Sequence, residues 1–121
     1  MLEKFGIGVD IVDVSRFNDK PYQENKIFYE KIFHPSEIKY CINRKNSSQS
    51  FATKFAIKES VIKCLNKKIS FLDIFTEHQN EKPTVKLLND PSYNFLVSVS
   101  HEKFFAVAVV ISETLDNTND L

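Results

Sequence analysis

The stretch FATKFAIKESVIKCL, residues 51–65, decides how this chain folds, because its spacing predicts one long amphipathic helix. On a helical wheel of about 100° per residue, Glu59 lies near the middle of the apolar arc, and Lys63 lies about 40° from it. The apolar side chains of this arc are Phe51, Ala52, Phe55, Ala56, Ile62 and Leu65. A carboxylate in such surroundings must be paired, neutral or bound to a cation. Glu59 is therefore the first candidate for a functional residue.

Two interpretations of Glu59 follow from the helix alone. It either forms an ordinary i,i+4 ion pair with Lys63 on an exposed face, or it lies in the wall of a cleft. Lys58 falls near the edge of the same arc, so three charged residues border one apolar face.

The segments around this helix predict a single α+β domain, in which a mostly antiparallel sheet packs against one long and several short helices. Alternating β-branched residues predict a strand over 7–12, with Asp10 on the face opposite Ile7, Val9 and Ile11. The other expected elements are helices over 25–33 and 37–43 and strands over 69–75, 84–88, 96–100 and 104–111, of which the last is apolar on both faces and is expected to be central. The long helix is expected to end near Asn66, which tolerates the left-handed conformation of a helix C-cap. The domain is expected to span 1–112, followed by a polar tail over 113–121.

Asp10 is a second carboxylate in an unusual place, since aspartate is disfavoured in strands. One interpretation is an edge strand with a solvated face. The other is that Asp10 lies next to Glu59, because two carboxylates and water commonly hold Mg²⁺ when a substrate phosphate completes the shell. The only glycines, Gly6 and Gly8, lie in the same segment, which indicates a backbone requirement there.

Other candidate residues are a histidine and a small basic group. His101 lies between a polar strand end and an apolar strand, where it is either a surface residue of a turn or a catalytic side chain. Arg44, Lys45 and Lys54 form the basic group, which is either a solvated surface or an anion site at a helix start.

The composition narrows the function classes. The chain has 121 residues, of which 42% are apolar, and its 16 basic residues balance 16 acidic ones. No overall field therefore favours nucleic acid or an anionic membrane. The apolar run 104–111 is too short to span a membrane, and the N-terminal MLEKFGIG lacks the apolar region of a signal peptide. Cys41 and Cys64 have no metal-site spacing and fit the reduced thiols of a cytoplasmic protein.

Three motifs occur in order along the chain. They are a G-x-D-I strand with an arginine six residues after the aspartate, F-A-x-K-E-[AS]-x-x-K on the long helix, and V-S-[ILV]-S-H in a hairpin. The segments that carry them are GIGVDIVDVSRF (6–17), FATKFAIKESVIK (51–63) and VSVSHEKFFAVAVVI (97–111). Together they resemble the holo-[acyl-carrier-protein] synthases, the short single-domain phosphopantetheinyl transferases.

The resemblance implies a phosphopantetheinyl transferase-like fold and a specific reaction. Coenzyme A gives its phosphopantetheine arm to a serine hydroxyl of an apo acyl carrier protein, and adenosine 3′,5′-bisphosphate leaves. The resemblance further implies that Asp10 and Glu59 bind Mg²⁺ and that Lys63 faces the pyrophosphate, where it stabilises or protonates the leaving phosphate. The serine needs a base, for which Glu59, His101 and a metal-bound water all qualify. The expected catalytic residues are Glu59, Lys63 and His101.

The resemblance also implies how ligands and partners bind. Cations near the adenosine 3′-phosphate are expected from the basic group, and Arg16 is expected to meet the acidic carrier protein. The residues expected to contact coenzyme A are Arg44, Lys45, Lys54, Lys58, Lys82, Pro83 and His101. The family is typically trimeric, so a homotrimer with coenzyme A pockets between subunits is expected.

The sequence departs from the family pattern at three places. Asn66-Lys67-Lys68 replaces a Gly-x-Gly, and Glu81-Lys82-Pro83 replaces Gly-Lys-Pro, so the Glu81 side chain is expected to weaken or reshape a contact with the adenine. Asp19 and Glu24 make the expected docking surface less basic. The alternative functions are a non-catalytic coenzyme A- or nucleotide-binding subunit and a different metal-dependent phosphate-ester enzyme.

Overall fold

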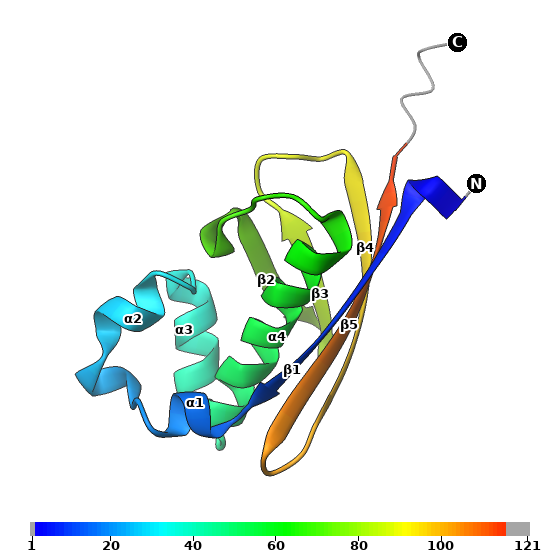
Figure 1. The fold of residues 1–121 in the computed structure, drawn as a ribbon. Helices are drawn as coiled ribbons and strands as arrows, with labels where there is room; N and C mark the ends of the chain where they lie inside the picture. The colour runs from blue at the N-terminus through cyan, green and yellow to red at the C-terminus, as the bar shows by residue number, and fades with distance from the viewer. Residues whose placement is uncertain (1, 116–121) are drawn as a thin grey trace.

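Helix α4 lies at the centre of the molecule, between a β-sheet on one side and three shorter helices on the other (Figure 1). The structure, a computed structural model, describes residues 2–115. The strands are β1 (Phe5–Asp13), β2 (Ile74–Gln79), β3 (Lys82–Leu87), β4 (Tyr93–His101) and β5 (Phe105–Thr114). The helices are α1 (Ser15–Asn18), α2 (Lys26–Glu30), α3 (Pro35–Ile42) and α4 (Ser47–Leu65), with 3-10 turns at Leu2–Lys4, Tyr22–Glu24 and Phe71–Asp73. This arrangement confirms the predicted α+β fold.

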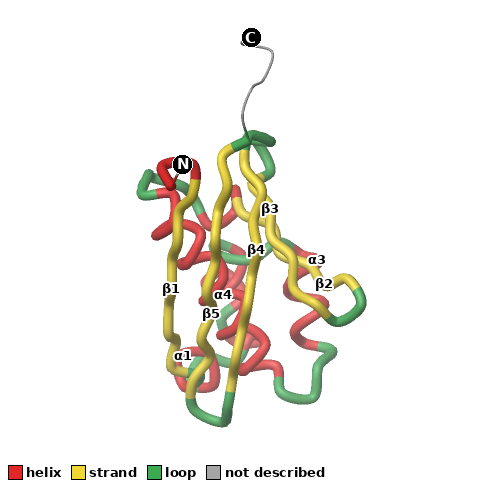
Figure 2. The backbone as a smooth tube through the Cα atoms, turned by 90° about the vertical axis from the view of Figure 1, so that its right-hand side faces the viewer, coloured by secondary structure: helices red, strands yellow, loops and turns green. Residues whose placement is uncertain are grey.

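Strand β5 is the central strand of the main sheet, because it pairs antiparallel with β1 on one side and with β4 on the other. Its position confirms the prediction from the apolar run 104–111. Strands β2 and β3 form a second antiparallel ladder that lies beside β4 (Figure 2). Strand β1 is therefore an edge strand of its three-stranded sheet, with its inner face against α4.

The two glycines of β1 bring this strand unusually close to helix α4. A Cβ atom at Gly6 would collide with the carbonyl oxygen of Cys64, and a Cβ atom at Gly8 would collide with that of Ser60. Any larger residue would push β1 away from the helix. The glycines thus set how closely Asp10, two residues after Gly8, approaches α4.

Helix α4 is buried on almost every side over its middle turns, residues 51–61, and not on a single arc as the wheel predicted. Ile57 and Val61, which lie outside the predicted arc, are fully buried. The sheet covers one side of the helix, and α1, α3 and β2 pack on the rest. Asn46 caps the start of α4 by accepting a hydrogen bond from the amide of Gln49, and Asn66 ends it in the left-handed conformation, as predicted.

The predicted strand over 69–75 is wrong for most of its length, because β2 begins only at Ile74. Ser70 starts a 3-10 turn instead: its hydroxyl accepts a hydrogen bond from the amide of Leu72, and Asp73 accepts one from the amide of Ser70. Such local side-chain bonds compete with a strand ladder. The expected helix over 25–33 is also shorter in the structure, which limits α2 to Lys26–Glu30.

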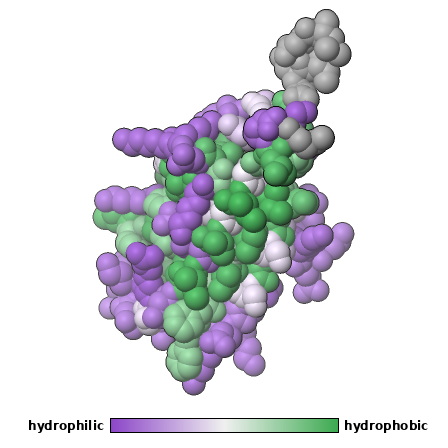
Figure 3. Space-filling model, turned by 45° about the vertical axis from the view of Figure 1, so that its right-hand side comes forward, coloured by the Kyte–Doolittle hydropathy of each residue, from purple (hydrophilic) through white to green (hydrophobic). Residues whose placement is uncertain are grey.

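No part of residues 2–115 covers the face of the sheet that is turned away from α4. Ile7 and Leu96 are each 70% exposed on this face. Figure 3 shows apolar side chains gathered over it in a continuous green area. The exposed apolar residues of this outer face are Phe5, Ile7, Val9, Ile11, Leu96, Phe105 and Ile111. Among the described residues, no helix is long and apolar enough to cross a membrane.

Candidate active site

Asp10 lies on the inner face of β1, which it shares with Gly8 and Val12. Its Oδ1 atom accepts a hydrogen bond of 2.9 Å from Nζ of Lys63, which also donates to the carbonyl oxygen of Val9 at 3.0 Å. The Asp10 side chain is 15% exposed and the Lys63 side chain is 55% exposed. This ion pair therefore lies at the edge of the helix–strand contact, where solvent and ligands reach it.

Glu59 lies one helical turn before Lys63 and next to Asp10. Burial raises the pKa of Glu59, and the negative charge of Asp10 raises it further, while the positive charges of Lys63 and Arg16 act in the opposite direction. The strand and the helix thus bring the two predicted carboxylates together. Lys63 forms its ion pair with Asp10 and not the simple i,i+4 pair with Glu59.

Two neighbouring carboxylates at the surface form a suitable site for a hard divalent cation, which prefers oxygen ligands. Burial and, to a smaller extent, the charge of Asp10 raise the pKa of Glu59, and a cation between the two carboxylates would relieve their repulsion. Among residues 2–115, no group of three or more His, Cys, Asp or Glu side chains gathers at one point. If such a cation binds, the chain would supply two ligands, and water and substrate phosphates would complete the shell of an ion such as Mg²⁺.

Arg16 lies in the short helix α1, directly after β1. Its Cζ atom is 4.9 Å from the centre of the Phe55 ring, and its charge opposes part of the rise in the pKa of Glu59. The side chain is exposed. The arginine of the first motif is thus an exposed cation at the rim of the carboxylate pair.

A separate cleft of about 550 Å³ opens between the start of α4, the end of α3, the β2–β3 turn and the end of β4. Glu81 lines it and has a left-handed φ of 64°, a conformation that favours glycine. Lys82, which was expected to bind coenzyme A, is not among the lining residues. The cleft does bring together the predicted residues Arg44, Lys45, Lys54, Pro83 and His101.

Lys58 does not reach this cleft, which corrects the expectation that it contacts coenzyme A. Its fully buried ammonium group donates to the carbonyl oxygens of Ile32 and Phe71 at 2.8 and 3.1 Å and to Oε1 of Glu37 at 2.7 Å. An ammonium group has three donor hydrogens. None is left for a ligand, so the role of Lys58 is structural.

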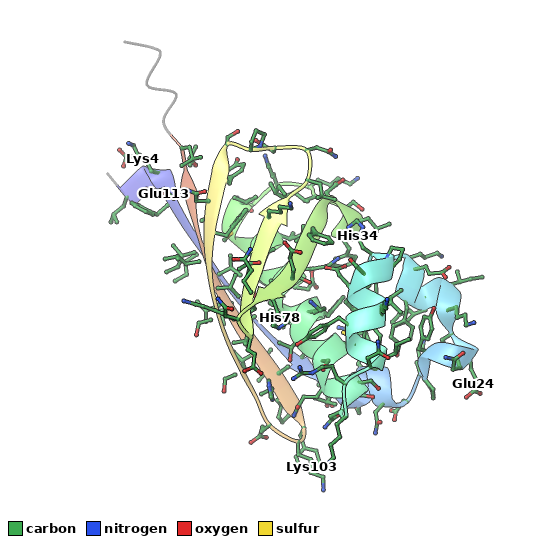
Figure 4. All side chains as sticks on the ribbon, turned by 180° about the vertical axis from the view of Figure 1, so that it is seen from behind. Lys4, Glu24, His34, His78, Lys103 and Glu113 are labelled. Atoms are coloured by element: carbon green, nitrogen blue, oxygen red, sulfur yellow. The ribbon has the colours of Figure 1, made fainter. Side chains whose placement is uncertain are left out.

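Sequence reasoning missed two aromatic side chains in the cleft, Tyr40 and His78. Their rings stack with centres 4.4 Å apart and an interplanar angle of 11°. Cζ of Arg44 and Nζ of Lys54 lie 5.1 and 4.8 Å from the centre of the Tyr40 ring. Burial lowers the pKa of His78 to about 4, with contributions from Lys54 and Arg44, so this side chain is neutral at pH 7. Tyr40 belongs to α3, whereas His78, labelled in Figure 4, belongs to β2, so no local sequence pattern links them.

The carboxylate pair and the cleft lie on different sides of α4. Ser50 lines the cleft, and Glu59 points about half a turn away from it around the helix axis. Asp10, Glu59 and Lys63 are not among the residues that line the cleft. One chain therefore presents two separate parts of the predicted site.

Comparisons with known proteins show to which family the chain belongs. Residues 6–110 match the family model of the 4′-phosphopantetheinyl transferase superfamily. A holo-[acyl-carrier-protein] synthase of Geobacter sp. (strain M21) is 38% identical over 122 residues, which cover 90% of this chain and 98% of that protein. The synthase of Bacillus anthracis str. Ames in complex with CoA (3′,5′-ADP) has a TM-score of 0.77 and 29% identity, over 90% of this chain and 96% of that chain. The Helicobacter pylori synthase in complex with coenzyme A has a TM-score of 0.74 and 34% identity, over 88% of this chain and 99% of that chain. The chain belongs to the holo-[acyl-carrier-protein] synthase family.

Proposed function

We propose that this chain transfers the phosphopantetheine arm of coenzyme A to a serine hydroxyl of an apo acyl carrier protein. The serine oxygen forms a bond to the phosphorus that carries the pantetheine arm. The bond from this phosphorus to the bridging oxygen breaks, and adenosine 3′,5′-bisphosphate leaves. The observation that carries the proposal is the meeting of Asp10 and Glu59 beside Lys63 in a member of this family.

Asp10 and Glu59 are the proposed ligands of Mg²⁺. Their closeness, and the raised pKa that Asp10 contributes to at Glu59, support this role. When bound, Mg²⁺ supplies positive charge that stabilises the two phosphates of coenzyme A during transfer.

Lys63 is the proposed partner of the leaving phosphate. Its side chain is more than half exposed, so its ammonium group can donate to a phosphate oxygen while it remains near Asp10. The serine proton must go to a base, and we assign this role to Glu59. Glu59 lies next to Asp10 and on the same side of α4 as Lys63, where the serine would meet the phosphate.

The cleft is the proposed site of the adenosine part of coenzyme A. Arg44, Lys45 and His101 place positive or hydrogen-bonding groups around it, which suits the 3′-phosphate. Pro83 and the stacked rings of Tyr40 and His78 add flat surface of the kind that a purine contacts. Lys82 is left without a role in the proposal.

The outer face of the sheet is the proposed subunit interface of a homotrimer. Its exposed apolar residues form a larger patch than scattered surface side chains would, and such patches mark interaction sites. Because the carboxylate pair and the cleft lie on different sides of one chain, assembly gives a way to combine them. In the proposed trimer, the carboxylate pair of one subunit lies beside the cleft of its neighbour.

The proposed protein partner is an acidic acyl carrier protein in the cytoplasm. Arg16 is exposed next to the carboxylate pair, where a carrier that presents its serine would dock. Asp19 and Glu24, which follow Arg16 in the sequence, are also exposed. The docking surface is therefore less basic than in the family pattern. The free thiols of Cys41 and Cys64 are compatible with a reducing compartment.

Intact-mass analysis of an apo carrier protein incubated with this chain, coenzyme A and Mg²⁺ tests the proposal. We expect a gain of one phosphopantetheine on the carrier, and no gain when a chelator removes the Mg²⁺. Tight coenzyme A binding without any mass gain would support a non-catalytic binding subunit instead. Hydrolysis of coenzyme A without need of a carrier would support a different phosphate-ester enzyme.

A further inference from the structure

We propose that Thr76 is a positioning residue that holds the ammonium group of Lys54 in the wall of the cleft, through a hydrogen-bonded chain that starts at the buried Glu37–Lys58 pair. The nature of the anion that Lys54 meets, a phosphate of coenzyme A, rests on the proposed function. The hydrogen-bonded chain itself follows from contacts within this protein.

The chain of contacts runs from the interior to the cleft. Oε1 of Glu37 accepts from Nζ of Lys58 at 2.7 Å, and its Oε2 atom accepts from the hydroxyl and the backbone amide of Thr76 at 2.6 and 2.8 Å. Oγ1 of Thr76 in turn accepts a hydrogen bond of 2.9 Å from Nζ of Lys54. Lys54 and Thr76 are each only 2% exposed, yet Lys54 lines the cleft.

The chemistry of these groups fixes the direction of every hydrogen bond. An ionised carboxylate only accepts and an ammonium group only donates. The single hydroxyl proton of Thr76 must therefore point to Glu37, which leaves an oxygen lone pair to face Lys54. Serine could replace threonine in this role, whereas valine, with the same branched shape, could neither donate to Glu37 nor accept from Lys54.

The Lys54 ammonium group has no carboxylate at ion-pair distance among the described residues. Glu37 pairs directly with Lys58, and Glu37 and Glu77 act on Lys54 only through their charge. Burial lowers the pKa of Lys54, which the negative charges of Glu37 and Glu77 partly oppose. Among residues 2–115, the hydrogen bond to Thr76 is the one that Lys54 makes, so two of its donors point elsewhere. A phosphate in the cleft would supply the missing negative charge.

The Tyr40 ring helps to define the direction of Lys54. Nζ of Lys54 lies 4.8 Å from the centre of this ring, so the ammonium group is held between a hydroxyl oxygen and an aromatic face. Without the Thr76 oxygen, the flexible lysine side chain would keep only the ring contact. We therefore expect Thr76 to affect the binding of the phosphate and not the transfer step.

The test compares Thr76→Val with Thr76→Ser in the full chain. For Thr76→Val we expect the KM for coenzyme A and the Kd for 3′,5′-ADP, measured by calorimetry, to rise roughly tenfold, as for a lost hydrogen bond to a charged group. The kcat should stay within about twofold, and Thr76→Ser should remain within about twofold of the wild type in all three constants. Thr76→Ala takes the place of Thr76→Val if that variant does not fold.

A double-mutant cycle with Lys54→Met then asks whether Thr76 acts through Lys54. We expect Thr76→Val to cause no further loss of affinity in the Lys54→Met background. An equal loss in both backgrounds, an unchanged affinity in Thr76→Val, or a fall in kcat with constant KM would overturn the positioning role. These outcomes leave the proposed function intact, whereas a wild type that neither binds coenzyme A nor transfers its arm would overturn both.

Discussion

Helix α4 contributes to two clusters of acidic and lysine side chains. The clusters contain similar groups but differ in how completely their carboxylates are paired. The surface cluster consists of Asp10, Glu59 and Lys63, and the buried cluster consists of Glu37, Lys54, Lys58 and Thr76. In the buried cluster, Glu37 accepts from Lys58, from Thr76 and from the amide of His34. In the surface cluster, the lysine forms its ion pair with one of two acids, and the other acid faces a like charge.

The pKa values of Glu37 and Glu59 are shifted in opposite directions for this reason. At Glu37, burial favours the neutral acid, but the attraction of Lys58 and hydrogen bonds from Lys58, Thr76 and His34 outweigh it and lower the pKa. At Glu59, burial and the charge of Asp10 act together and raise the pKa. A carboxylate whose oxygens are fully hydrogen-bonded and ion-paired stabilises the fold, whereas a carboxylate that lacks such partners can bind a ligand.

The largest expected effect comes from the surface cluster. We predict that Glu59→Gln lowers kcat about 10³-fold, because it removes a charged Mg²⁺ ligand and the proposed base. Intact-mass time courses of the carrier protein measure the rate. The free energy of unfolding should not fall, since the replacement removes the repulsion between Glu59 and Asp10. A Glu59→Gln variant that keeps most of its activity would show that the surface cluster is not the catalytic one.

The second effect compares one lysine from each cluster. Lys58→Met leaves Glu37 charged and buried, so we predict a loss of about 3–5 kcal/mol in the free energy of unfolding. Lys63→Met removes a partly exposed pair and should cost less than about 1 kcal/mol, while it lowers activity. Urea unfolding of both variants provides the measurement. Equal losses of stability would mean that burial does not distinguish the two clusters.

The sequence predicted the surface cluster and failed to predict the buried one. Asp10 stood out because aspartate is rare in strands, and Glu59 because it interrupts an apolar arc. The three motifs then predicted the family, which the comparisons confirm. The order of the helices and the central place of β5 were also predictable, because both depend on local periodicity and on the length of apolar runs.

Lys58 was misassigned because a helical wheel assumes that one side of a helix faces solvent. Helix α4 has protein on both sides, and the partner of Lys58 comes from α3, at Glu37. The link from Thr76 to Lys54 spans 22 residues, and that from Thr76 to Glu37 spans 39. Such contacts depend on how β2 and α3 pack against each other, and this packing cannot be predicted from the spacing of residues within one segment. The error over 69–73 had a different cause, the local hydrogen bonds of Ser70 and Asp73.

A smaller effect should appear when Mg²⁺ is added without substrate. At a concentration about ten times its Kd, an ion that binds only the folded chain adds roughly 1.4 kcal/mol to the free energy of unfolding. We predict this gain for the wild type and for Thr76→Ser, whose change lies in the buried cluster. Asp10→Asn should lose the gain, as measured by thermal unfolding with and without Mg²⁺. A gain that persists in Asp10→Asn would place the ion elsewhere.

The smallest expected effect is a difference in pH dependence, measured without Mg²⁺. Because the pKa of Glu37 is lowered on folding, its contribution to stability is present above the ordinary pKa of a glutamate, about 4.5, and is lost as the pH falls below it. Because the pKa of Glu59 is raised, the folded chain keeps that proton longer than the unfolded chain, so its contribution falls as the pH rises above 4.5. Glu59→Gln removes only the second contribution. The variant should therefore gain more stability between pH 4 and pH 7 than the wild type does, and an equal or smaller gain in urea unfolding would contradict the repulsion between Glu59 and Asp10.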